Sequence, residues 1–346
     1  MSLSVKNQIN LFLRSLMLLW IHKYKVHVIL LTFALVAIIF LLGNVFFIPA
    51  ARIQNVSAQT ISTCLNRVNI DLNELHWIYV PESADELHTE ENLFFLAGQL
   101  IANDIVKANV CPSGGLALNG YANACGIAVA RPAMIYIQNM LNEPILQAYK
   151  ETGVPPVLLK QLIRVESEFW PSQYVYTHYG FGHITNMGMR NALQWNPALA
   201  AKVCPTSSTE DCRTSITIAD QILSSLVATC ASCKYGIDPL IADRSVDILA
   251  EVVLGYCYQT ARIIYNATER HSSLVVDYAT IWKLTLMDYN AGSTCVYEAV
   301  AATFAKMKGP MKWADISPNV SGNLCIRGMT YANQITAKVF NFPPMR

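Results

Sequence analysis

Apolar residues follow two patterns along this chain. Residues 26–48, VHVILLTFALVAIIFLLGNVFFI, contain no charged side chain over 23 positions, which exceeds the ~20 residues that cross a bilayer as a helix. Beyond them, apolar residues recur at helical spacing in segments near 130–150, 155–170, 216–230, 241–265 and 275–289. Strand-like alternation is sparse. The pattern predicts a mainly α-helical protein behind one N-terminal transmembrane helix.

Charged residues beside the apolar run orient it in a membrane. Four basic residues precede the run, and no acidic residue occurs before Asp71. The positive-inside rule therefore places residues 1–25 in the cytoplasm and the remainder outside, as a single-pass protein of the cell membrane. A cleaved signal peptide is the alternative, because IPAA follows the run. Signal peptides have shorter apolar cores that begin earlier, so a retained anchor at 26–48 is favoured.

Cysteine usage agrees with an exported domain. All ten cysteines follow the apolar run, and an even number in an exported chain is typical of a disulfide framework. Proximity in sequence favours the pairs 111–125, 204–212 and 295–325. The cysteines at 204, 212, 230 and 233 include a C-x-x-C, but their irregular spacing makes zinc the weaker interpretation. The overall composition, 53% hydrophobic and 14% charged with a net charge of +1, gives no reason to expect a nucleic-acid partner.

A glutamate interrupts the apolar stripe of one predicted helix. In LLKQLIRVESEFWPSQY (158–174), Leu159, Leu162 and Ile163 define the stripe, and Glu166 follows on the same side. Burying a carboxylate is costly unless it finds a cation, such as a neighbouring lysine or arginine, or keeps its proton. Pro171 disfavours helix at the preceding residue, so Glu166 lies near the helix C-terminus, where the dipole favours the protonated form.

Three motifs in order resemble one family. Glu166–Ser167 closes the helix that begins VPPVLLKQLI; YGFGHIT (179–185) follows; and DYNAG (288–292) comes much later. Together they resemble the lytic transglycosylases of the soluble (SLT) type, in the lysozyme-like superfamily. FWP and WNP (195–197) resemble a membrane-anchored, cysteine-rich subset. The resemblance covers roughly 125–310. It implies a lysozyme-like catalytic domain there and says nothing of the first 120 residues. From the chain itself, 49–124 is expected to be a juxtamembrane helical or spacer region, and 311–346 a C-terminal tail packed by a disulfide.

The resemblance implies cleavage of the MurNAc–GlcNAc β-1,4 bond of peptidoglycan by a single acid, ending in a 1,6-anhydro ring. Most glycosidases need two carboxylates, but here the only other carboxylate within 20 residues after Glu166 is Glu168, which is expected to face solvent. Trp170 and Trp195 are expected in the core rather than against sugar rings. The resemblance implies that Glu166 is the catalytic residue, and the expected substrate-binding residues are Ser167, Gly180, Gly182, His183, Tyr289 and Asn290.

One departure from the family pattern keeps other functions open. His183 stands where the family has glutamine; a histidine can also hydrogen-bond a sugar amide. No third ligand is spaced to join His178 and His183, so no metal or other cofactor is expected. The alternatives are a hydrolytic muramidase and a weakly active or inactive peptidoglycan-binding component of an envelope-spanning assembly, such as a secretion machine.

Overall fold

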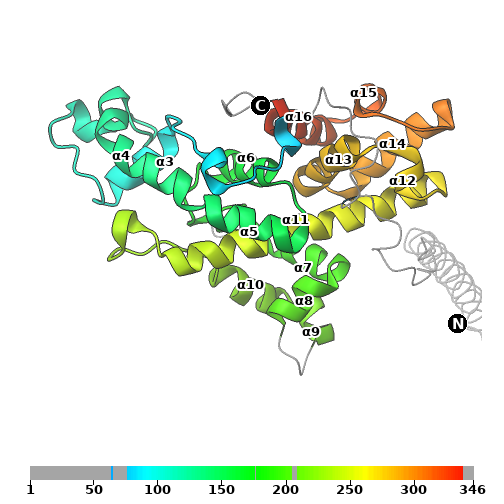
Figure 1. The fold of residues 1–346 in the computed structure, drawn as a ribbon, viewed down its shortest axis with the longest axis horizontal. Coiled ribbons are helices and arrows are strands. Elements are labelled where there is room, and N and C mark those ends of the chain that lie inside the picture. Colours follow the sequence, from blue (N-terminus) through cyan, green and yellow to red (C-terminus); the bar gives the residue numbers. More distant parts are fainter. Residues whose placement is uncertain (1–63, 65–75, 176, 205–208, 338–346) are drawn as a thin grey trace, which may run out of the picture. The chain divides into compact units, whose positions relative to one another are not determined.

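Helices make up most of the computed structural model, which describes Cys64 and residues 76–175, 177–204 and 209–337 (Figure 1). The prediction of a mainly α-helical protein is confirmed. The helices are α3 (Phe94–Ala102), α4 (Ala124–Met140), α5 (Asn142–Thr152), α6 (Pro156–Ser167), α7 (Asn186–Trp195), α8 (Pro197–Val203), α9 (Thr209–Thr214), α10 (Ile216–Ser224), α11 (Pro239–Thr268), α12 (Ser272–Val275), α13 (Tyr278–Ala291), α14 (Ser293–Met307), α15 (Trp313–Ile316) and α16 (Asn323–Ala337).

The long helix α11 forms the centre of the fold. It begins at Pro239, whose ring suits a first helical position, and the side chain of Asp238 accepts hydrogen bonds from the next two backbone amides. From Ser245 to Ala261 nearly every side chain is buried, because α5, α7, α8, α13 and α14 all pack around it. Figure 1 shows α11 running past α5 and α13. A helix that is apolar all round is a core helix.

Strands are scarce in the described residues. One hairpin pairs β1 (Gln173–Tyr174) with β2 (His178–Tyr179), antiparallel. Short 3-10 helices occur at Ala84–Leu87, Pro112–Gly115, Lys234–Gly236 and Ser317–Asn319. The helix expected over 130–150 is two helices, because the chain bends at Leu141, which ends α4 and precedes α5.

Disulfides pair all ten cysteines. The three pairs favoured by sequence proximity are confirmed: 111–125, 204–212 and 295–325. The C-x-x-C cysteines, Cys230 and Cys233, bond to each other. Cys64 bonds to Cys257 in the middle of α11. The four cysteines considered for zinc are therefore all in disulfides.

The WNP segment joins α7 and α8 to the central helix. Asn196 accepts hydrogen bonds from the first backbone amides of α8 and so caps it. Its side-chain amide donates to the Glu251 carboxylate of α11 at 2.7 Å and to the Glu251 carbonyl at 2.9 Å. Lys202 lies 3.1 Å from the same carboxylate. Trp195 is half-buried and Trp170 is buried, as the core interpretation of the two tryptophans expects.

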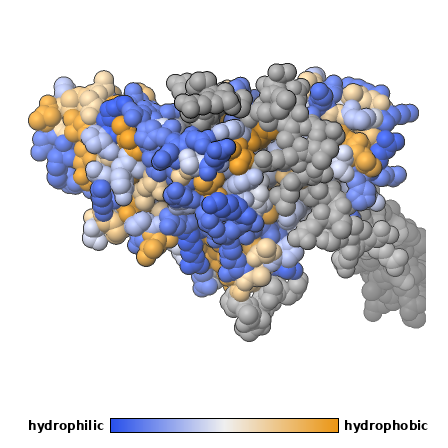
Figure 2. Space-filling model, in the orientation of Figure 1, coloured by the Kyte–Doolittle hydropathy of each residue, from blue (hydrophilic) through white to orange (hydrophobic). Residues whose placement is uncertain are grey.

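Residues before 125 and after 310 share the core of the helices between them. Residues of α3 contact α4, and α16 contacts both α13 and α6; the described residues belong to one compact unit. Hydrophobic side chains reach the surface at several places, including the end that holds α3 and α4 (Figure 2), where Val110 and Leu118 are exposed.

The anchor expected at 26–48 lies outside the described residues. Among the helices of the described part, none combines the length and the apolar character needed to cross a membrane.

Candidate functional site

Helix α6 places Glu166 in its last turn. The helix starts where Pro155 and Pro156 fix the backbone, and it ends where Glu168 adopts a left-handed conformation with φ +45°. Leu158, Leu159, Leu162 and Ile163 are buried with no exposed surface. Glu166 lies beside this apolar wall, with 16% of its side chain exposed. The carboxyl is thus enclosed but still reachable from the surface.

A tyrosine of α16 bonds to the Glu166 carboxyl. The Tyr331 hydroxyl donates a hydrogen bond to Oε1 of Glu166, and Tyr331 as a residue is 9% exposed. These two residues are 165 positions apart, and they meet because α16 packs on α6. Since Oε1 is occupied by this donor, Oε2 is the oxygen left to meet a substrate.

A tight turn after β2 brings His183 to Oε2. Gly180 has φ +65°, and His183 itself has φ +48°. Residues 179 and 184 bond to each other through both backbone amides, which closes the turn. His183 Nδ1 lies 3.6 Å from Glu166 Oε2. The ring of Tyr174 stacks on the imidazole with centroids 5.3 Å apart.

Tyr289 of α13 holds that turn through a hydrogen bond to its backbone. Its hydroxyl donates a 2.5 Å hydrogen bond to the Gly182 carbonyl, and its ring meets Tyr256 edge to face at 5.2 Å. A Cβ on Gly182 would lie 2.3 Å from Leu249 Cδ1 and 3.0 Å from the Tyr289 hydroxyl. A Cβ at position 182 therefore fits only if the Leu249 side chain or the turn shifts.

The remaining predicted residues are placed differently. The Ser167 hydroxyl is buried and donates to the carbonyl of Ile163 in its own helix. Asn290 is exposed at the C-terminal end of α13. The structure therefore gathers Glu166, Gly182, His183 and Tyr289 around one point, with Gly180 in the same turn, and leaves the Ser167 hydroxyl turned to its helix.

Burial sets the protonation state of the central groups. It raises the pKa of Glu166 to about 7, against the smaller, opposite effect of the Tyr331 hydrogen bond. Burial, with a contribution from His178, lowers the pKa of His183 to about 4. Between these values Glu166 keeps its proton and His183 is neutral. Their 3.6 Å approach is therefore not an ion pair in that pH range, although the atoms are close enough for one.

The surrounding hydroxyls remain donors. Burial and the nearby Glu166 charge raise the pKa of both Tyr289 and Tyr331 well above the usual value. Burial also raises the pKa of Asp288, the residue before Tyr289 in α13, to about 8. The Thr260 hydroxyl donates a hydrogen bond to Oδ2 of Asp288 at 3.2 Å. The site combines a protonated carboxyl with neutral hydrogen-bonding neighbours, which is the environment of a general acid.

Two features of this region were absent from the sequence analysis or contradict it. Tyr331 lies beyond the motifs, and no local pattern marks it. Glu168 is not a solvated surface residue, and that prediction is wrong. Its Oε2 accepts hydrogen bonds from the backbone amides of Phe95 at 2.8 Å and Leu96 at 3.4 Å. A carboxylate at the start of α3 satisfies amides that have no partner within the helix.

His178 and His183 lie edge to face, with ring centroids 6.2 Å apart. Within the described part of the chain, no three histidine, cysteine, aspartate or glutamate side chains gather closely enough to hold a metal ion.

Comparison with protein-family models, curated proteins and solved structures finds no match to this chain.

Proposed function

We propose that this protein is a membrane-anchored peptidoglycan lytic transglycosylase of the SLT type, with a lysozyme-like helical domain and Glu166 as its acid and base. One observation carries the proposal: a lone carboxyl sits in an apolar wall, keeps its proton to about pH 7 and leaves one oxygen reachable. An ion-paired structural glutamate would have a cation at that oxygen, whereas its neighbour here is a neutral histidine.

The first step uses the protonated form. Glu166 donates its proton to the glycosidic oxygen, and the bond from that oxygen to C1 of MurNAc breaks. The GlcNAc side leaves with a new hydroxyl, and positive charge develops at C1. The Glu166 carboxylate that remains is stabilised by the Tyr331 hydroxyl. Proton transfer from a positioned acid contributes roughly 10²–10⁴-fold to such reactions.

The second step returns the proton. The Glu166 carboxylate accepts the proton of the C6 hydroxyl of the same MurNAc, and O6 forms a bond to C1. The products are a 1,6-anhydroMurNAc end and a free GlcNAc end, without addition of water. A single carboxyl suffices because it serves each role in turn, whereas hydrolysis by inversion needs a second carboxylate to activate water.

Other residues hold the substrate in this proposal. His183, in place of the family glutamine, hydrogen-bonds a sugar amide beside Oε2. Gly180 and Gly182 let the turn approach the glycan backbone, and Tyr289 fixes that turn through the Gly182 carbonyl. Asn290 and Ser167 belong to the motif set that the resemblance assigns to substrate. The anchor at 26–48 would keep the enzyme at the membrane beside the wall, where an envelope or secretion machine is the expected partner.

The product masses test the reaction. Purified full-length protein with its disulfides intact is incubated with peptidoglycan, and released muropeptides are weighed by mass spectrometry. Anhydro products, one water lighter than reducing muropeptides, are expected from the wild type and not from Glu166→Gln. Reducing products would show a muramidase. If both folded proteins bind the polymer and release nothing, the protein is a wall-binding component and the enzyme proposal fails.

A further inference from the structure

Helix α6 has a second polar face, away from Glu166. Lys160, Arg164 and Glu168 follow at four-residue spacing, so they line up along one side of the helix and its end. Glu166 is two residues from Arg164 and therefore points about 200° around the helix from it. All three side chains on this second face contact the same stretch, residues 87–96, which we call the strap.

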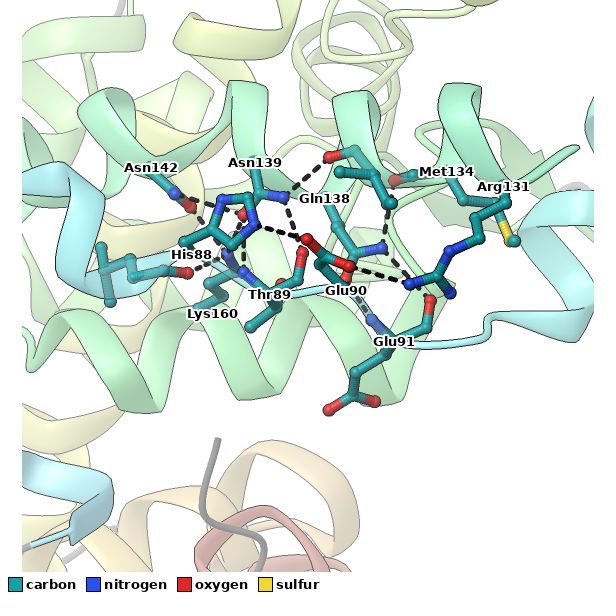
Figure 3. A network of polar contacts seen from close by, with 12 residues as sticks. His88, Thr89, Glu90, Glu91, Arg131, Met134, Gln138, Asn139, Asn142 and Lys160 are labelled. Carbon is teal, nitrogen blue, oxygen red and sulfur yellow. Dashed lines mark hydrogen bonds and ion pairs between the residues drawn. The ribbon is translucent and has the colours of Figure 1, made fainter. Parts of the chain in front are cut away.

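The first residue of the strap, Leu87, binds a buried lysine of α6. Lys160 Nζ donates to the Leu87 carbonyl at 2.5 Å and to Asn142 Oδ1 at 2.7 Å, with Asn139 Oδ1 at 3.3 Å (Figure 3). The lysine side chain has no exposed surface. Burial lowers its pKa to about 7, and Glu91 opposes this shift. A buried amine surrounded by three oxygens holds the strap to α5 and α6 at one point.

Side-chain amides of α4 then bind the strap as a neighbouring strand would. Asn139 accepts from the Thr89 amide at 2.8 Å and donates to the Thr89 carbonyl at 2.7 Å. Gln138 accepts from the Glu91 amide at 2.9 Å and donates to the Glu91 carbonyl at 3.2 Å. Figure 3 shows both amides pointing at the strap. These paired bonds fix the backbone, so the direction of the Glu91 side chain is fixed as well.

The middle and end of the strap are tied to α6 by charge. Arg164 Nε donates to the Glu91 carboxylate, and both side chains are about four-fifths buried. At the far end, Glu168 caps α3, whose N-cap position holds Leu93, a residue without a capping group. Glu168 is two residues beyond Glu166. The strap therefore contacts α6 and its end over residues 160–168, the segment that contains Glu166.

We propose that the Glu91–Arg164 pair is a positioning element for the candidate acid, because it presses the C-terminal half of α6 toward Tyr331 and His183. This inference rests on the function proposed for Glu166. Helix α6 contains no cysteine, so no disulfide fixes it, and its place between α16 and the strap depends on non-covalent contacts on both faces. Without the pair, the Glu166 end of the helix can move away from α16, and water reaches the carboxyl.

Neutral variants of the pair test this without introducing a new charge beside Lys160 or Glu168, which also face Glu91. The variants are Glu91→Gln, Arg164→Gln and the double variant, in the full-length protein. The matched control is Glu90→Gln, since Glu90 precedes Glu91 in the strap but pairs with Arg131 of α4 at 2.8 Å, where both side chains are about half exposed. Arg164→Lys, which keeps the charge, is the conservative variant.

The main readout does not depend on activity. Glutamate carboxyl carbons are labelled with ¹³C and titrated by NMR, and the Glu166 signal is the one missing from Glu166→Gln. Each single variant is expected to lower the Glu166 titration midpoint by about one pH unit or more, toward the value of a hydrated carboxyl. The double variant should shift it no further than a single one, because the two residues act as one pair. Arg164→Lys should keep the Glu166 titration midpoint close to that of the wild type, and Glu90→Gln should leave the midpoint unchanged.

Activity gives a second readout, in samples kept well below their melting temperatures. The kcat for anhydro-product release should fall about ten-fold in each single variant, with a smaller change in KM. Unchanged Glu166 titration in the pair variants, or a shift equal to that of the Glu90→Gln control, would overturn the positioning role even if the melting temperature falls. Absence of anhydro products from the wild type would overturn the proposed function instead, and the titration would still decide whether the strap positions Glu166.

Discussion

At the scale of single residues, burial of Glu166 destabilises the folded protein when the carboxyl is ionised. Its pKa is 4.5 as an ordinary carboxyl and about 7 in the folded protein. The folded state therefore holds a proton that the unfolded chain releases. The contribution of this group to stability is fully present below about pH 4.5 and is lost as the pH rises through about 7.

Glu166→Gln should therefore stabilise the protein at pH 8 by up to about 3 kcal/mol and have little effect at pH 4.5, since one pKa unit corresponds to ~1.4 kcal/mol. Denaturant unfolding at the two pH values measures this. Asp288, whose pKa is raised to about 8, will leave some pH dependence in both proteins. The exposed Glu143→Gln is the control. An equal effect of Glu166→Gln at both pH values would contradict the raised pKa.

Tyr331→Phe removes the hydroxyl that stabilises the Glu166 carboxylate. Hydrogen bonds to charged groups contribute about 1.5–3 kcal/mol, so kcat should fall about 10- to 100-fold. The pKa of Glu166 should rise, because the removed bond lowers it. The pH at which activity declines should move upward, as a pH–rate profile would show. Tyr297→Phe, exposed on α14, should change neither; an unaltered profile in Tyr331→Phe would remove Tyr331 from the site.

His183 offers a direct comparison with the family residue. His183→Gln keeps a hydrogen-bonding group at this position, and we expect activity within about ten-fold of the wild type. His183→Leu fills similar space without a polar atom, and the lost hydrogen bond should lower kcat/KM by at least ten-fold. Steady-state release of muropeptides measures both. A fully active leucine variant would mean that the imidazole does not contact the substrate.

The same residues show what a sequence can reveal about a site. The position of Glu166 beside an apolar wall was predictable, because this residue interrupts an apolar stripe within eight neighbouring positions. Tyr331 was not, since its position opposite Glu166 depends on how α16 packs, 165 residues later. Glu168 was misjudged because its position two residues from Glu166 implied a solvent-facing side. The backbone of Glu168 is left-handed, and its carboxylate binds two backbone amides of α3, which lie more than 70 positions away in the sequence.

At the scale of elements, the turn over residues 180–184 depends on close packing. Gly182→Ala would bring a Cβ within 2.3 Å of Leu249 Cδ1, so either the buried Leu249 side chain or the turn must shift, and a shift of the turn takes it away from α11 and from Tyr289. We expect a loss of about 1–3 kcal/mol in unfolding free energy and a marked loss of activity, because His183 moves with the turn. Gly309→Ala is the matched control, since its Cβ would meet only one atom, at 3.7 Å.

Thermal unfolding and muropeptide release, measured on both glycine variants, decide this prediction. If Gly182→Ala is as stable and active as Gly309→Ala, the turn is not held against α11 as described.

Element limits followed from local chemistry where strong signals exist. The helix expected over 155–170 occurs at Pro156–Ser167, because prolines mark both of its ends. The helix expected over 241–265 occurs at Pro239–Thr268, because its apolar character is continuous. The strap lies within the segment 49–124, for which the sequence predicted no more than a juxtamembrane region. Its backbone is bound by the side-chain amides of Gln138 and Asn139, which no periodicity could have indicated.

At the scale of the whole molecule, one disulfide joins distant parts of the chain. Cys64–Cys257 spans 193 positions. Closing so long a loop lowers the conformational entropy of the unfolded chain, which raises the unfolding free energy by roughly 5 kcal/mol in the chain-entropy model. Replacing both cysteines by serine should lower the unfolding free energy by a large part of that amount. Replacing Cys230 and Cys233, which close a loop of only 3 positions, should cost much less. Guanidinium unfolding of the two double variants compares them; equal losses would contradict the loop-length account.

The Cys64–Cys257 bond also determines how mechanical load would enter the domain. Tension applied through the chain before Cys64 passes across the covalent bond into α11, the central helix, as well as along the backbone toward the strap. A covalent crosslink does not yield at forces that break hydrogen bonds, so the strap is spared most of that tension. In the proposed function, where the domain binds the wall and is tethered to a membrane, this bond would let the domain be pulled without shifting the helix that presents Glu166.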